Sequence, residues 1–101
     1  MKPERFEKLK NELYDLVLKP KTREECAMLL YDLCTFKELE QMALRARAAK
    51  LFLEGKTYSV ITAETELSSA TLSRISRSLT HGSGGYAKFI TPGEEESEGE
   101  R

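Results

Sequence analysis

Two short helical patterns separated by three residues constrain the fold of this chain most strongly. The first covers about residues 58–65 and the second about residues 69–79, with the turn Glu66-Leu67-Ser68 between them. Two helices joined by so short a turn form a helix-turn-helix, in which the second helix faces outward. The apolar side chains spaced to form the core between the two helices are Ile61, Leu67, Leu72 and Ile75. Residues 58–79 are therefore predicted to form a helix-turn-helix.

Three further helices are predicted before this segment. One has an apolar stripe and ends near Lys19 and Pro20; the stripe comprises Phe6, Leu9, Leu13, Leu16 and Val17. Capping-box pairs, Thr22 with Glu25 and Thr35 with Glu38, begin the next two helices. Gly55 is expected to end the longer, third helix as a left-handed cap. The fold class is predicted to be all-α, a helical bundle with a helix-turn-helix.

Size and composition indicate one domain that gains stability from a partner. A chain of 101 residues buries only about 60–65% of the surface its unfolded form exposes. The alanine-rich residues 43–50 are expected to let a helix of a second chain approach closely. The charged first twenty residues and the lack of a long apolar run predict neither a signal peptide nor a membrane span, so a cytoplasmic location is expected. Cys26 and Cys34 are predicted to be buried thiols, and no metal or cofactor is expected.

Charge is unevenly distributed along the chain. Residues 41–90 contain seven basic and three acidic side chains, a formal charge of +4, whereas residues 91–101 have a formal charge of −4. The basic middle favours a polyanionic partner. We predict a domain over residues 1–90 and a disordered acidic tail over residues 91–101, with a flexible loop and a short docking apolar piece before the tail. Two roles for the tail stay open: competition with that polyanion for the basic residues of the middle segment, and solubility alone.

The second helix of the helix-turn-helix has the residue types that a DNA-reading helix needs. Ser68 is expected to cap it, and the short side chains of Ser69, Ala70 and Ser73 allow close approach to DNA. Hydroxyls donate to phosphates or base edges, and arginines contact phosphates or guanine. The predicted DNA-binding residues are Lys56, Ser68, Ser69, Ala70, Thr71, Ser73, Arg74, Arg77 and Ser78. Glu66 occupies the turn position where glycine is usual, so either the turn geometry departs from the usual one or the turn stores strain.

Residues 33–79 resemble the tryptophan repressor superfamily, and within it the tryptophan-repressor-like YerC/YecD group. The same parts follow in the same order: a helix capped by Thr35, an Arg-x-Arg pair at Arg45 and Arg47, a Leu-x-Gly at Leu53 and Gly55, and the helix-turn-helix. This resemblance implies an intertwined homodimer whose N-terminal helices interlock between chains. It also implies two helix-turn-helix units one DNA turn apart on double-stranded DNA, with a palindromic operator.

The resemblance also implies where a small effector would bind. Arg45 and Arg74 match the two arginines that flank the corepressor indole in the tryptophan repressor, and polar positions of that region are matched by Thr35, Thr71 and Ser78. The implied ligand pocket therefore comprises Thr35, Arg45 and Arg74. However, Ile75 stands in place of a glycine and Asp32 in place of an apolar residue. Tryptophan is therefore not the expected ligand, and an unidentified planar or anionic effector stays open.

Together these features predict a dimeric, sequence-specific DNA-binding transcriptional regulator, similar to the Trp repressor, that does not respond to tryptophan; repression and activation both stay open. Ile61 and Glu64 stand where the tryptophan repressor has basic residues, so the operator of this protein should differ from that of the repressor. Glu64 should point away from the DNA phosphates. The alternative is a helical protein–protein interaction module without DNA binding, which Glu64 and the acidic tail motivate. An enzyme is not expected, because no catalytic constellation, metal-ligand spacing or phosphate-binding glycine loop is present.

Overall fold

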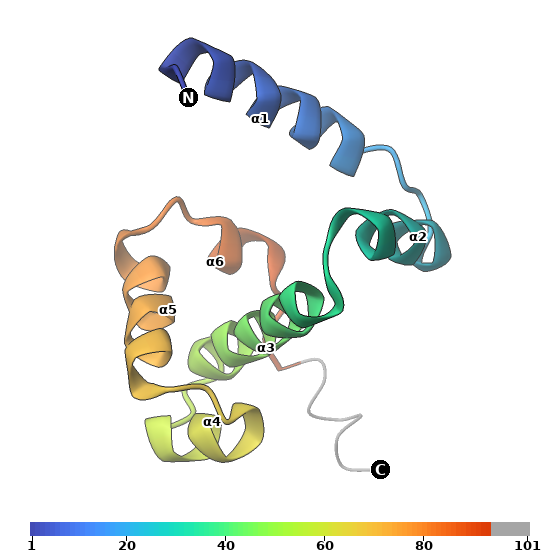
Figure 1. Cartoon of the computed structure of the whole chain (residues 1–101). Coiled ribbons are helices and arrows are strands. Elements are labelled where there is room, and N and C mark those ends of the chain that lie inside the picture. The colour runs from blue at the N-terminus through green and yellow to red at the C-terminus, as the bar shows by residue number, and fades with distance from the viewer. Residues whose placement is uncertain (94–101) are drawn as a thin grey trace. The chain divides into compact units, whose positions relative to one another are not determined.

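The computed structural model describes residues 1–93, which fold into helices without any strand (Figure 1). The helices are α1 (Pro3–Val17), α2 (Arg23–Leu33), α3 (Phe36–Leu53), α4 (Tyr58–Thr65), α5 (Ser69–His81) and α6 (Gly85–Phe89). The all-α prediction is confirmed, and most of the predicted disordered tail lies outside the described residues. Contacts divide the chain into two units, Met1–Leu39 and Glu40–Arg101.

Side-chain caps start α2 and α3 at the predicted residues. At α2, Thr22 Oγ1 accepts the N–H of Glu25 at 3.0 Å, while the Glu25 carboxylate accepts the N–H of Lys21 at 2.8 Å. At α3 the capping box is reciprocal: the N–H of Glu38 donates to Thr35 Oγ1 at 3.0 Å, and the N–H of Thr35 donates to Glu38 Oε1 at 2.8 Å. Both helix starts therefore follow from local sequence alone.

Gly55 ends α3 as predicted. Its φ of +82° places it in the left-handed region that favours glycine. Its N–H donates to the carbonyl of Phe52 at 2.9 Å, and the N–H of Lys56 donates to the carbonyl of Leu51 at 3.0 Å. This pair of bonds is a Schellman motif, which satisfies carbonyls at the end of the helix and turns the chain toward α4.

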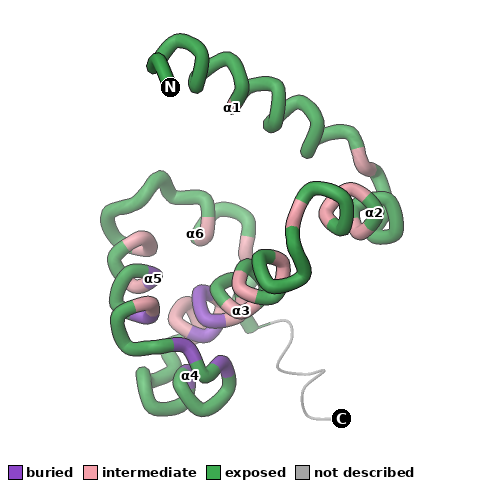
Figure 2. The backbone as a smooth tube through the Cα atoms, in the orientation of Figure 1, coloured by how far each residue is buried: buried purple, intermediate pink, exposed green. Residues whose placement is uncertain are grey.

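The helices α1 and α2 bury no residue within this chain (Figure 2). The predicted apolar stripe of α1 is largely exposed, with Phe6 at 52%, Leu9 at 37% and Leu13 at 40% of their full accessible surface. The prediction of buried thiols is wrong: Cys26 is exposed and Cys34 is half-buried. The physical reason is that α2 has helical apolar spacing but no interior within one chain against which to pack.

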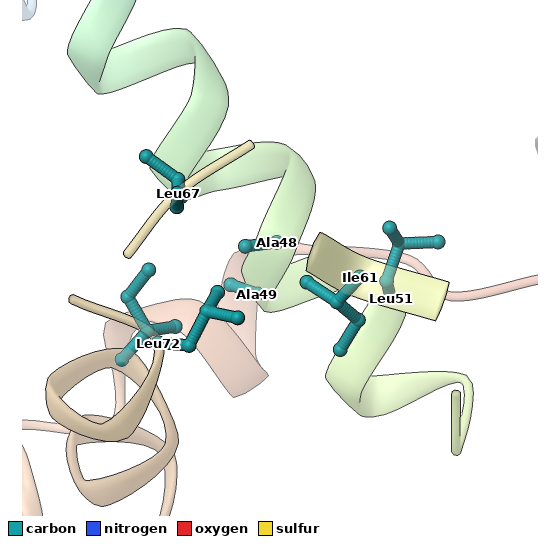
Figure 3. Close-up of a cluster of buried hydrophobic side chains, with 7 residues drawn as sticks. Ala48, Ala49, Leu51, Ile61, Leu67 and Leu72 are labelled. Atoms are coloured by element: carbon teal, nitrogen blue, oxygen red, sulfur yellow. The ribbon is translucent and has the colours of Figure 1, made fainter. Parts of the chain in front are cut away.

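A cluster of seven buried hydrophobic side chains holds α3 against the helix-turn-helix (Figure 3). It comprises Ala48, Ala49, Leu51, Ile61, Leu67, Leu72 and Ile75. The predicted core of α4, the turn and α5 is confirmed. Ala48 and Ala49 are fully buried in this cluster, so the expectation that they meet a helix of a second chain is wrong. Their small side chains instead let α3 approach the helices of its own chain.

The segment after α5 is more ordered than a flexible loop. Within it α6 packs against α5, and Tyr86 and Ile90 contact the buried cluster, whereas Phe89 is exposed. Gly82 follows α5 at a point where a Cβ would collide with the carbonyl oxygen of Ser78. The prediction that a short apolar piece of this segment docks on the domain is confirmed. The prediction of a flexible loop is wrong for residues 85–89, which form a helix. Among residues 1–93, no helix has the length and apolar character needed to cross a membrane.

Candidate nucleic-acid interface

Both helices of the helix-turn-helix begin with a side-chain cap. Thr57 Oγ1 accepts the N–H of Val60 at 3.2 Å at the start of α4. Ser68 Oγ accepts the N–H of Thr71 at 3.1 Å at the start of α5, which confirms the predicted cap. Each bond satisfies one of the amides that a helix N-terminus leaves without a partner. The caps therefore fix where the second helix begins relative to the turn.

Thr65 holds the turn between the two helices, and sequence reasoning missed it. The residue is only 3% exposed. Its hydroxyl donates to the carbonyl of Ile61 at 2.8 Å and accepts the N–H of Leu67 at 3.3 Å. One side chain thus joins the last turn of α4 to the chain that enters α5. A threonine four residues after the core residue Ile61 and just before the turn was the available signal.

Replacing Thr65 by valine should destabilise the protein by about 1–2 kcal/mol, because the amide of Leu67 would be left buried without a partner. Valine keeps the β-branched shape, so little packing is lost. The free energy of unfolding from urea titration measures the effect. Thr62→Val on the exposed side of α4 is the matched control and should change it by less than about 0.5 kcal/mol. Equal effects of the two substitutions would contradict the role of the Thr65 hydroxyl.

Glu66 adopts the left-handed conformation, with φ 58° and ψ 19°. It is the only non-glycine residue with positive φ among residues 1–93. Its N–H donates to the carbonyl of Thr62 at 2.8 Å, which closes α4. The sequence left two alternatives, an altered turn geometry or a strained turn. The structure shows the usual geometry, so Glu66, which has a Cβ, bears a strain of about 1–2 kcal/mol.

Glu66→Gly should therefore raise the free energy of unfolding by about 0.5–1 kcal/mol, because relief of strain outweighs the added freedom of the unfolded chain. Glu66→Ala is the control: it removes the same charge but keeps the Cβ, so it should not stabilise. Urea titrations of the two variants separate the backbone effect from the charge effect. If both variants gain the same stability, charge rather than backbone strain explains the gain.

One side of α5 is exposed and opposite the core. At 3.6 residues per turn, Leu72 and Ile75 share one side of the helix, and both are buried. The residues on the other side are all exposed; they are Ser69, Ala70, Ser73, Arg74 and Arg77, here called the α5 face. Among the described residues, no ion pair involves Arg74 or Arg77. The α5 face thus combines short side chains, hydroxyls and two cations.

The other predicted DNA-binding residues lie outside the α5 face as defined above; they are Lys56, Ser68, Thr71 and Ser78. The Ser68 hydroxyl is engaged in the cap, and it also donates to Thr71 Oγ1 at 3.0 Å. Ser68 therefore acts mainly as a structural residue, whereas the Thr71 hydroxyl keeps its own proton to donate. Ser78 is half-buried near the end of α5, and Lys56 is exposed where α3 joins α4.

Glu64 is held by an arginine that sequence reasoning did not connect to it. Arg47 Nη2 lies 3.1 Å from Glu64 Oε1, and its Nε donates to the same oxygen at 3.4 Å. The pair joins α3 to α4 across 17 residues of sequence. Because both side chains are over a third exposed, the pair adds little stability. It does place a cation beside Glu64 and so reduces the repulsion that this carboxylate would exert on a phosphate.

The implied effector residues belong to two helices, since Thr35 caps α3, Arg45 lies within α3 and Arg74 lies within α5. Arg45 and Arg74 are both exposed, and Thr35 belongs to the other unit of the chain. Ile75 is 2% exposed and forms part of the buried cluster. A hollow of about 360 Å³ lies between the end of α5 and α6; its lining includes Ser78, Gly82, Tyr86 and Phe89, but neither arginine.

Comparisons with known proteins agree with this architecture. Residues 8–93 match the family described as Trp repressor protein. The uncharacterized protein YerC of Bacillus subtilis is 40% identical over 76 residues, which are 75% of this chain and 73% of YerC. A crystal structure of a candidate Trp repressor from Staphylococcus aureus has a TM-score of 0.79 at 37% identity and covers 87% of this chain and 89% of that chain. A TrpR-like protein from Eubacterium eligens has a TM-score of 0.76 at 32% identity, covering 88% and 87%. The chain belongs to the Trp repressor family.

Proposed function

We propose that this protein is a sequence-specific, DNA-binding transcriptional regulator that inserts α5 into the major groove. The observation that carries the proposal is the α5 face, which lies opposite the buried Leu72 and Ile75. Short side chains at Ser69, Ala70 and Ser73 let the helix approach base edges closely, while Arg74 and Arg77 can contact phosphates or guanine. Membership of a repressor family supports the same function.

We propose that the working form is a homodimer on a palindromic operator. The apolar stripe of α1 is largely exposed, and α1 and α2 contain no buried residue within one chain. Helices with such faces need a partner surface, because exposed apolar rows of this length are uncommon in monomers. A two-fold dimer would set two α5 helices about one DNA turn, or 34 Å, apart. Sedimentation equilibrium of the full chain tests this assembly.

The folded domain is proposed to cover residues 1–90, with residues 91–101 as a tail. Tryptophan is not proposed as its effector, because Ile75 occupies core space where the repressor has glycine, and burial of this side chain supports that reading. A planar or anionic effector at Arg45 and Arg74 is compatible with the exposure of both side chains. No enzymatic role is proposed.

Selection of genomic DNA fragments on the purified full chain, followed by sequencing, tests the proposed function. Recovered fragments should share an inverted repeat whose half-sites are centred about 10 base pairs apart. Retention of no fragment at low salt would disprove DNA binding. In that case the alternative, a helical protein-binding module, is supported by the exposed stripe of α1 and should give a stoichiometric protein complex.

A further inference from the structure

The last described residues return to the helix that supports the helix-turn-helix. The N–H of Gly93 donates to Glu54 Oε2 at 2.9 Å, near the end of α3. A little earlier, Ile90 packs against the buried cluster that holds α5. Residues 94–101 therefore begin from a fixed point in the same unit as the α5 face.

The sequence beyond this point has the charge and length to reach the α5 face. Residues 94–101 contain five glutamates and one arginine, a formal charge of −4. Eight extended residues span up to about 28 Å, whereas the 13 residues of α5 span about 20 Å. A unit of about 60 residues has a radius of gyration of only about 11 Å, so no surface of this unit is far from Gly93.

The α5 face is the complementary surface. Arg74 and Arg77 are exposed and form no ion pair among the described residues. No acidic side chain belongs to α5; of the two glutamates that precede it, Glu64 is paired with Arg47 and Glu66 is exposed. Carboxylates resemble phosphates as charged acceptors for guanidinium groups. We propose that residues 94–101 lie on the α5 face of their own chain when DNA is absent and compete with DNA phosphates for Arg74 and Arg77.

This inference rests on the proposed DNA-binding function and adds a regulatory consequence to it. Because the tail must leave before any duplex can bind, it should weaken binding to operator and to random DNA by the same factor. The factor should shrink as salt rises, since both the tail and DNA depend on charge. A tail that serves only solubility would change neither affinity.

Three proteins test the proposal: the full chain, a chain ending at Gly93, and a full chain that carries Glu94→Gln, Glu95→Gln, Glu96→Gln, Glu98→Gln and Glu100→Gln. Fluorescence anisotropy with a random duplex should show about tenfold tighter binding by both variants at about 50 mM salt, and convergence with the full chain at about 300 mM. Adding Arg74→Ala and Arg77→Ala to the full and shortened chains should abolish their difference.

Loss of the tail also changes the formal charge of the chain from −1 to +3, so a readout without DNA is required. Amide chemical shifts of residues 69–77 should differ between the full and shortened chains at low salt and coincide at high salt. Coincident shifts at low salt would overturn the contact, and equal DNA affinities of the three proteins would overturn the competition while leaving DNA binding intact. If none of the three binds DNA, the proposed function fails and this inference falls with it.

Discussion

Replacing Arg74 and Arg77 together by alanine is expected to weaken DNA binding about a thousandfold at low salt. Both guanidinium groups belong to the α5 face, and neither forms an ion pair among residues 1–93. A dimer would lose four cationic contacts at once, each contributing about 1 kcal/mol or more. The free energy of unfolding should stay within about 0.5 kcal/mol, because both side chains are at the surface.

The dependence of affinity on salt gives the sharper measurement. Loss of four phosphate contacts should lower the slope of log K against log salt by about 3–4. Lys19→Ala with Lys21→Ala is the matched control, because it removes two exposed cations from the segment between α1 and α2. The control should leave both affinity and slope nearly unchanged. A similar loss in both double variants would show that total charge, rather than the α5 face, governs binding.

Leu72→Ala is expected to have the largest effect on stability, about 3 kcal/mol. Leu72 is fully buried in the cluster that joins α5 to α3, so truncation leaves a cavity that the small cluster cannot easily close. For a chain of this length, the melting temperature should fall by about 15 °C. DNA binding should be lost at temperatures where the variant is unfolded and largely retained where it is folded.

Two controls separate cavity formation from other causes. Leu72→Met keeps the volume and should cost less than about 1.5 kcal/mol, whereas Val60→Ala removes a side chain that is 41% exposed and should cost less still. Calorimetry of the three variants should show the largest loss of stability for Leu72→Ala, a smaller loss for Leu72→Met and the smallest loss for Val60→Ala. A cost for Leu72→Ala below that for Leu72→Met would show that the cluster does not depend on this side chain.

The features that sequence predicted correctly are those fixed by near neighbours. The caps at Thr22, Thr35 and Ser68 join residues three apart, and the left-handed turn at Gly55 depends on a single residue type. The apolar spacing within residues 58–79 was enough to identify the buried core of the helix-turn-helix. Assignment of the α5 face followed from the same periodicity, because side chains opposite a core must face outward.

The features that sequence did not predict depend on which surfaces meet. Helical spacing cannot tell whether an apolar stripe packs within its own chain, so it wrongly predicts that Cys26 is buried and that Ala48 meets a second chain. The contact of Arg47 with Glu64 spans 17 residues and has no local signature. The sequence does not predict the short helix α6, because the glycines around it indicate a turn or loop.

The third helix belongs to both units, because α3 begins before their boundary and ends beyond it. Its buried residues, Ala48, Ala49 and Leu51, all lie near its C-terminal end, beside the helix-turn-helix. Spacing along α3 is therefore critical at this end of the helix. Inserting one residue between Ala48 and Ala49 would rotate Leu51 by about 100° and advance it by about 1.5 Å relative to Ala48, so the two side chains could no longer share the side of α3 that packs on α4 and α5.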